Sequence, residues 1–504
     1  MAESRWDTVV IGAGVGGLVA AGILARAGRK VLVLERNRHS GGTAASYTRG
    51  GFSFPMGPLG FSSPRVVQAG LERMPAPMPT LERARYLLHA FGLRLPLSLP
   101  LAQLRDRLRA AFPADDQGVS IFFEQVERLG RAMDRLEDPV ERALLERAAL
   151  APAGDYLRDL ILDPALRRVL GSLGAREPYS GLPLLAAMWR LMCREGIWKP
   201  RGGMDAFVGS LAAAAEAAGA KMLLGAEAAA IEIERGRARG VAIAGGETIP
   251  AGAVISNADY QTTFLRLVDD RHLTDEFFQE VFNARPTGSI LQVALGLDAS
   301  AVDLTAFAAA DRIVYRREEA AEPDWGAAAV DPAELAGAEL EISLWSRPEP
   351  GSNRASLVIR TEAEYAHFAR YRPAPKQRLA SYAGYKERLG RVLAAEAERV
   401  APGLTGAVRV LDVATPLTFE ERGGRSGGSV AGWSWDFEDL ADFTGRELVR
   451  TPIAGLYLAG CQAYSGLFLG GVPTAVLSGV KAAEAVLAGA APVETVSLPG
   501  GQRR

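Results

Sequence analysis

The sequence predicts an α/β protein in which a mostly parallel sheet carries an inserted α+β unit of antiparallel strands and helices. Three observations predict it. Two short apolar runs flank an alanine-rich segment within residues 8–34, strand-like runs fill residues 221–259, and alternating apolar residues recur at 289–297 and 340–345. Continuous apolar runs are typical of parallel strands buried on both faces, whereas alternation is typical of half-buried antiparallel strands.

The composition argues against several classes of function. The 504 residues carry 57 basic and 59 acidic side chains, a formal net charge of −2, which leaves no electrostatic footprint for nucleic acid. Only two cysteines, Cys193 and Cys461, and four histidines are present, and their spacing suggests neither a disulfide framework nor a metal site. No Ser/His/Asp arrangement or carboxylate pair stands out. Any redox chemistry must therefore use a borrowed group, and we assign no catalytic residue.

The first element is a buried strand at Thr8–Ile11 that runs directly into a glycine-rich turn and then a helical segment, 18–29. Gly12 permits the tight turn, Gly14 lets the backbone approach a pyrophosphate, and Gly17 lets the helix lie close to the sheet. The helix N-terminus then offers free N–H groups to phosphates. This arrangement is typical of a Rossmann-type fold.

The second strand, Lys30–Leu34, ends in Glu35, which lies 18 residues after Gly17. A carboxylate near that spacing accepts a hydrogen bond from a ribose hydroxyl. Strand, glycines, helix, strand and acid in this order predict a bound dinucleotide. They do not by themselves separate FAD from NAD(P).

A second glycine doublet follows Glu35, at Gly41-Gly42-Thr43, and Phe52–Pro58 comes soon after it. The doublet offers another surface without side chains beside the cofactor. In a nicotinamide enzyme the chain would normally continue into another helix here. The alternative is a surface loop of small residues.

With these residues the sequence resembles the phytoene desaturase, carotenoid isomerase and retinol saturase group of flavoproteins, within the amine-oxidase-like FAD superfamily. Four separated blocks carry the resemblance in the family's order. They are the N-terminal fingerprint through Gly57-Pro58, Pro200–Met204, Val254–Asp259, and the pair Gly455–Gly460 and Gly470–Ala475.

The resemblance implies FAD as cofactor and a role for each matching position. Gly12, Gly14 and Gly17 would hold the pyrophosphate, Glu35 the ribose, Gly41 and Gly42 the flavin side, and the backbone near Ala228 the adenine. Gly460 would face the phosphates, and Gly471 with Val472 would lie under the flavin ring. The expected cofactor-binding set also includes Gly16, Arg36, Thr43 and Cys461.

Two positions depart from the family pattern. Cys461 follows Gly460 where the family usually has aspartate, and Pro55 stands where the family has an acid. Losing a hydrogen bond of a charged group costs about 1.5–3 kcal/mol, so both departures could weaken FAD binding. Cys461 is interpreted as a small packing residue, with a redox thiol as the alternative.

The same blocks predict a discontinuous chain organisation. We expect an FAD-binding domain from 1–75, 196–275 and 445–488, a substrate domain from 76–195 and 276–444, and a flexible tail at 489–504. The first insertion is predicted to be mostly helical and the second to open with strands. Trp433 and Trp435 are candidates for walls of the substrate site or for structural tryptophans.

The resemblance implies that flavin N5 exchanges hydride with a hydrophobic isoprenoid or polyene. Two alternatives are an amine oxidase, which usually needs a lysine-bound water and an aromatic pair beside the flavin, and a flavoprotein without turnover. No apolar run of about 18 residues lacks charge and proline, so we expect no membrane-spanning helix. A cytoplasmic location is expected. Residues 86–104 predict a buried strand and turn or, alternatively, a lipid-facing segment that touches a membrane without crossing it.

Overall fold

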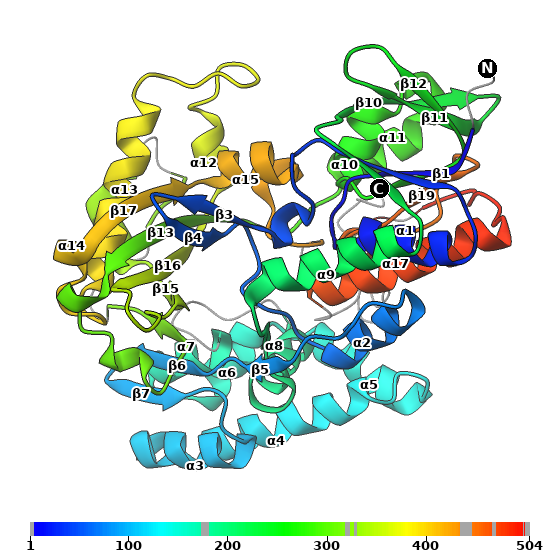
Figure 1. The fold of residues 1–504 in the computed structure, drawn as a ribbon. Coiled ribbons are helices and arrows are strands. Elements are labelled where there is room, and N and C mark those ends of the chain that lie inside the picture. Colours follow the sequence, from blue (N-terminus) through cyan, green and yellow to red (C-terminus); the bar gives the residue numbers. More distant parts are fainter. Residues whose placement is uncertain are drawn as a thin grey trace.

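The computed structural model describes residues 5–172, 181–317, 323–326, 330–433, 446–465, 470–496 and 498. It confirms the α/β fold class, with two large sheets joined by helices (Figure 1). How the chain divides into the expected domains stays a prediction.

The first sheet has the order β10-β11-β12-β1-β2-β9, with β19 also paired to β12. Strands β19, β12, β1, β2 and β9 run parallel, and β10 and β11 extend β12 as an antiparallel hairpin. Its strands therefore come from the beginning, middle and end of the chain. They are β1 (Trp6–Ile11), β2 (Val31–Glu35), β9 (Lys221–Leu224), β10 (Ala228–Glu234), β11 (Arg237–Ile243), β12 (Thr248–Ser256) and β19 (Leu456–Leu458).

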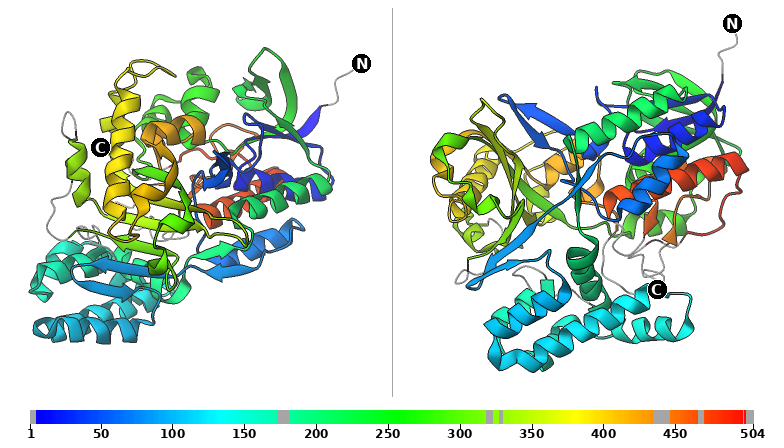
Figure 2. Two further views of the ribbon diagram at one scale, coloured as in Figure 1. Left: turned by 60° about the vertical axis from the view of Figure 1, so that its left-hand side comes forward. Right: turned by 60° about the horizontal axis from the view of Figure 1, so that its bottom comes forward.

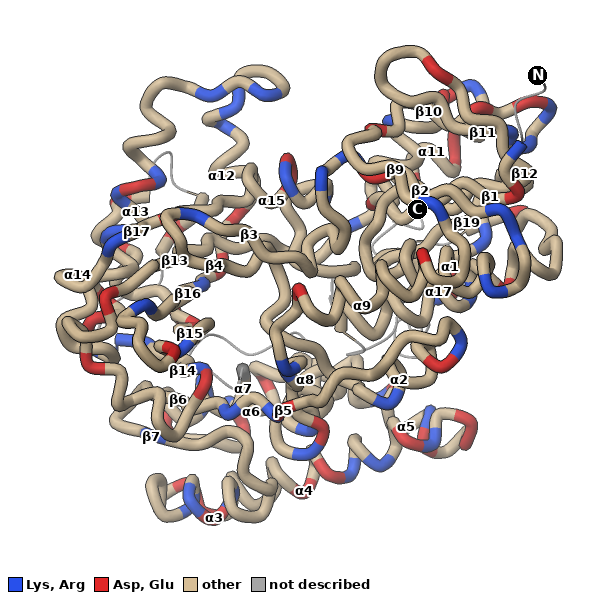
Figure 3. Tube along the Cα trace, in the orientation of Figure 1, with Lys and Arg blue, Asp and Glu red and all other residues tan. Residues whose placement is uncertain are grey.

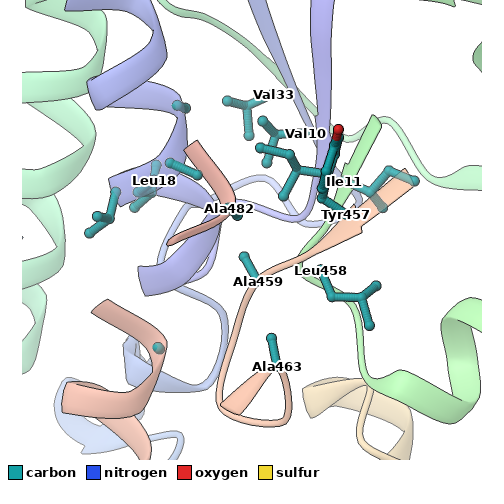
Figure 4. Packing of buried hydrophobic residues seen from close by; sticks show 14 of the residues in the cluster. Val10, Ile11, Leu18, Val33, Tyr457, Leu458, Ala459, Ala463 and Ala482 are labelled. Atoms are coloured by element: carbon teal, nitrogen blue, oxygen red, sulfur yellow. The ribbon is translucent and has the colours of Figure 1, made fainter. Parts of the chain in front are cut away.

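Helices α1 (Val15–Arg26) and α17 (Gly471–Ala488) lie on this sheet, while α9 (Gly203–Ala217) packs against α1 and α2 (Pro64–Arg73) against α17. Figure 4 shows Val10 and Val33 of the strands near Leu18 of α1 and Ala482 of α17 in one apolar cluster. Small residues bring α1 and α17 together, because a Cβ on Gly479 would collide with the carbonyl oxygen of Gly16.

The second sheet is mostly antiparallel, in the order β17-β13-β16-β15-β14-β6-β7, with β14 and β6 parallel. Its strands from the first insertion, β6 and β7, were not expected to join those of the second. The strands are β6 (Tyr86–Ala90), β7 (Leu93–Pro96), β13 (Ser289–Asp298), β14 (Arg312–Tyr315), β15 (Leu340–Ser346), β16 (Arg354–Ala363) and β17 (Val408–Ala414).

Helix α13 (Tyr382–Ala397) covers one face of the second sheet, where Val293, Ile342 and Ile359 are buried. Beyond it lie the short helices α12 (Tyr365–Ala369), α14 (Leu404–Ala407) and α15 (Pro416–Gly423). The hairpin β3 (Ser46–Arg49) and β4 (Phe52–Pro55) lies against the opposite face through β16 and β15.

A helical layer lies below the second sheet in both views of Figure 2. Charged residues of both signs alternate along its outer helices (Figure 3), in keeping with the near-zero net charge. The helices are α3 (Leu101–Ala111), α4 (Asp116–Met133), α5 (Pro139–Ala149), α6 (Ala153–Leu160), α7 (Pro164–Ser172) and α8 (Leu182–Arg190). A separate two-stranded antiparallel sheet, β5 (Leu81–Arg83) and β8 (Trp198–Pro200), lies where the chain enters and leaves this layer.

Among the described residues, α17 alone is long and apolar enough to cross a membrane by length and composition. Half of it is buried, against α1 and α2, which is how a core helix packs.

The described part of the tail, 489–496 and 498, contacts the first core at a few residues, while most of its other residues are exposed. The Val493 N–H donates to Thr451 O at 3.1 Å, and Val496 and Leu498 are buried in the first core. The flexible tail expected at 489–504 stays a prediction. Trp435 and residues 499–504 lie outside the described residues.

Asp311 ties together strands from both insertions. Its carboxylate accepts the Arg85 N–H at 2.9 Å and lies 3.0 Å from Lys199 Nζ and 3.5 Å from Arg347 Nη2. Burial raises the pKa of this carboxyl, but hydrogen bonds from Arg85 and then Lys199 outweigh burial and hold the pKa well below its usual value.

Asp311→Asn should lower the free energy of unfolding at pH 7 by about 1–3 kcal/mol, because charged hydrogen bonds are lost. Because the folded-state pKa is depressed, the charged carboxylate stabilises the fold above the unfolded-state pKa of about 3.9. This stabilisation is lost progressively as the pH falls from there toward the folded-state pKa, so the difference in unfolding free energy between wild type and variant should be smaller at pH 3 than at pH 7. Urea unfolding at both pH values measures this. Asp106→Asn, at an exposed ion pair, is the control; an equal loss at pH 7 and 3 would contradict the role of the charge.

Candidate functional site

The glycine-rich turn after β1 lies directly against the second glycine doublet. Gly14 and Gly41 form a parallel bridge, and the Gly41 N–H donates to Ala13 O at 2.7 Å. Gly12 and Gly41 have φ of 94° and 110°, a left-handed region that favours glycine. A Cβ on Gly42 would lie 3.4 Å from the Gly14 Cα. The structure therefore brings these predicted residues together as one surface of bare backbone.

Asn257 occupies the centre of this surface, although the sequence predicted no role for it. Its backbone N–H donates to Ile11 O at 2.8 Å, and its Oδ1 accepts the Gly17 N–H at 3.0 Å. A Cβ on Gly14 would lie 2.6 Å from Asn257 Nδ2. The Val254–Asp259 block carries the signal in the sequence, but its match to a family motif assigns no role to a single residue.

The C-terminal segment completes the surface from the other side. The Gly460 N–H donates to Ser478 Oγ at 3.0 Å. A Cβ on Gly16 would lie 2.6 Å from the Gly460 nitrogen and 2.9 Å from Ala475 O. Residues from the start, middle and end of the chain thus meet within van der Waals distance at α1.

Glu35 is buried at the end of β2 and is held by backbone donors. Its Oε2 accepts the Ala13 N–H at 2.9 Å, and its Oε1 accepts both Asn37 N–H groups at 2.8 Å. A carboxylate has about four acceptor positions, so one remains for a ribose hydroxyl. The backbone at 225–226 bonds to Asn37 and Glu35 carbonyls, which brings Ala228 to the same end of the sheet.

The remaining predicted residues are placed as follows. Arg36 donates to the carbonyls of Glu421 and Arg422 at the end of α15, so its guanidinium holds the second unit rather than standing free. Gly471 begins α17 with Ala431 beside it, and Val472 is buried. Cys461 is a half-buried free thiol beside the loop at 432. Contact of all these residues with the cofactor stays a prediction.

A chain of contacts leads from the glycine surface to the second sheet. Arg425 Nη2 donates to Thr43 Oγ1 at 2.6 Å, and a Cβ on Gly57 would lie 2.5 Å from Thr43 O. Arg360 on β16 donates to Gly57 O. The face of that sheet opposite α13 therefore looks toward the predicted flavin end of the site.

These features fit a dinucleotide with two aromatic ends. The trough is bare at Gly12, Gly14 and Gly41, an uncapped helix N-terminus adjoins it, and a buried carboxylate closes one end. Among the described residues no three His, Cys, Asp or Glu side chains gather as a metal site.

Gly14→Ala should weaken FAD binding about tenfold or more, because the added methyl must displace the Asn257 amide and stands where a phosphate would approach. Gly209→Ala is the matched control, since a Cβ there meets nothing within 4 Å. Titration of apoprotein with FAD measures both. Equal affinities for the two variants would contradict the assignment of the trough.

Comparison with known proteins agrees with this geometry. The family model "Flavin containing amine oxidoreductase" matches residues 15–409. A prolycopene isomerase of Daucus carota is 29% identical over 58% of this chain and 52% of its own length, so the chain spans about half of such relatives. A phytoene dehydrogenase of Streptomyces griseus is 27% identical over 98% of this chain and 97% of its own.

Among solved structures, an oxidoreductase from Methanosarcina mazei superimposes with a TM-score of 0.63 at 17% identity, over 94% of this chain and 99% of its own. That likeness shows the fold. The cofactor is FAD, and the chain belongs to the family of flavin-containing amine oxidoreductases.

Proposed function

We propose that this chain is an FAD-dependent oxidoreductase that desaturates, saturates or isomerises a hydrophobic isoprenoid or polyene. The observation that carries the proposal is the match to a phytoene dehydrogenase along nearly the whole of both chains. Such a match includes the second sheet and the helical layer, where a substrate unit would differ between families, as well as the nucleotide-binding sheet.

The residues of this chain bind the reactants, orient them and exclude water from them. When bound, FAD supplies hydride exchange at its N5 atom. Apolar clusters lie on the face of the second sheet that looks toward the site, with Phe54 from β4, Leu88 from β6 and Phe122 from the helical layer. Alignment of the reacting atoms and exclusion of water can contribute about 7–11 kcal/mol without an acid or base.

The positions of the lysines disfavour the amine-oxidase alternative. The sequence has six lysines, and four of them are engaged elsewhere. Lys199 pairs with Asp311, Lys481 with Glu447, Lys221 lies over Trp6, and Lys386 donates to Val413 O. Lys30 lies at the opposite end of β1 from the glycine turn, and Lys376 is in the loop before α13.

Anaerobic holoenzyme should lose its oxidised flavin absorption on addition of phytoene, or reduced holoenzyme should regain it with a polyene acceptor. Putrescine should change neither spectrum and should release no hydrogen peroxide in air. Absorption spectroscopy with product extraction measures this, and Gly14→Ala without FAD is the control. Peroxide release with putrescine would support the alternative; a flavin inert to every polyene would contradict the proposal.

We also propose a peripheral contact with membranes, where such substrates reside. Support comes from the helical layer, where Val140, Leu150 and Leu162 are 74%, 85% and 76% exposed. Leu150→Asp with Leu162→Asp should reduce co-sedimentation with phosphatidylcholine vesicles severalfold, since charge opposes insertion. Leu379→Asp, on the loop before α13, is the control; unchanged sedimentation of the double variant would contradict the proposal.

A further inference from the structure

A band of charged and polar side chains crosses the site-facing side of the second sheet. The strand register places Arg312 of β14 opposite Ser343 of β15, and Glu341 of β15 opposite Arg360 of β16. Alternation along the strands puts all four side chains on the same face. Three of these four residues are charged and one, Ser343, is polar; together they form the charged strip.

Apolar clusters lie on both sides of the charged strip. Tyr86 and Leu88 on β6 pack with the helical layer, while Phe52 and Phe54 on β4 pack with Ala294 of β13. The two clusters remain separate. A sheet face that only supported the core would be apolar throughout, because burial of charge is costly.

Arg312 is only 6% exposed and is incompletely satisfied. One guanidinium nitrogen, Nη1, donates to the Tyr86 hydroxyl, and the guanidinium carbon lies 5.1 Å from the centre of the Tyr86 ring. Its Nη2 is buried and has no hydrogen-bond partner among the described residues. An arginine stays protonated in proteins, so this N–H group is a permanent donor with no acceptor among the described residues.

The charges in the strip do not balance. Arg312 and Arg360 contribute two positive charges and Glu341 one negative charge, and the nearby Asp311 is engaged by Arg85, Lys199 and Arg347. Burial lowers the pKa of Arg360 to about 10, with Glu341 opposing and Arg312 adding to the decrease. Burial also lowers the pKa of Arg312, but Tyr86 and Glu341 outweigh burial and raise it above its usual value. The net positive charge of the strip, together with the Nη2 of Arg312 that lacks a partner among the described residues, favours an added anion.

We propose that the charged strip binds the carboxylate of an amphipathic polyene, with Arg312 Nη2 as its principal donor. This inference rests on the proposed function and refines its substrate class. Arg360 reaches Gly57 at the flavin end, and Arg312 is two strands away, about 10 Å across the sheet. The carboxylate would thus fix how far along the polyene the flavin reacts. The terminal carboxylate sets the position of the polyene relative to the flavin, and the apolar clusters contact the polyene's hydrocarbon chain.

The test compares ligands on FAD-loaded protein in one detergent, following the flavin absorption band. All-trans-retinoate should bind about tenfold or more tightly than all-trans-retinol, because hydrogen bonds between charged groups are the stronger class. Palmitate, a carboxylate without conjugation, should bind more weakly than retinoate. Palmitate binding as tight as that of retinoate would assign the strip to saturated fatty acids and contradict the polyene carboxylate.

Arg312→Gln should reduce the preference for retinoate over retinol to about twofold or less while retaining affinity for retinol. Ser343→Asp is an independent variant that leaves the Arg312 side chain in place. It places a carboxylate opposite Arg312, at about 4.5–5.5 Å between Cβ atoms, and should abolish the preference equally. Arg409→Gln, at the exposed pair with Asp298 on β17, should keep the wild-type preference.

Outcomes separate the two proposals. Equal binding of retinoate and retinol, or a preference that persists in both variants, overturns the anion site alone. A protein that keeps FAD but binds neither retinoid contradicts the proposed function together with the anion site.

Discussion

Close backbone contact at α1 is the constraint on which the rest of the site depends. The N-terminal turn, Asn257 after β12 and Gly460 after β19 converge there, and each approach is possible only because Gly14, Gly16 and Gly17 lack side chains. The contact is a matter of backbone geometry, so it shapes the predicted cofactor trough without any reactive side chain. It also explains why the sheet can be built from three distant stretches of sequence.

Asn257 connects the two parts of this contact, helix α1 and the glycine turn. Its side-chain oxygen, Oδ1, accepts the Gly17 N–H of α1, and its side-chain nitrogen, Nδ2, faces Gly14. One side chain therefore connects the helix to the glycine turn. A side-chain amide can serve as donor and acceptor at once, which neither aspartate nor leucine could do. The next acid, Asp259, accepts from Ser426 and thereby ties the same segment to the loop that leads to Trp433.

The two faces of the second sheet differ in chemistry. The face under α13 is a continuous apolar core, whereas the opposite face carries Arg312, Glu341 and Arg360 between two apolar clusters. Incompletely paired charge in such a place costs stability and is retained where a ligand repays the cost. The contacts from Thr43 through Gly57 to Arg360 couple that face to the cofactor trough.

The sequence by itself determined the elements whose signal is local. The glycine turn, Glu35 and the apolar runs at 8–11 and 30–34 depend on spacing along a few dozen residues, and the strand–turn–helix follows from them. Tertiary structure decided what local spacing cannot encode. The pairing of β6 with β14, the position of Asn257 in the trough and the gathering of Arg312 with Arg360 join residues far apart in the chain. Alternation predicted strands at 289–297 and 340–345, but strand order and register set which polar side chains share a face, and long-range packing alone fixes both.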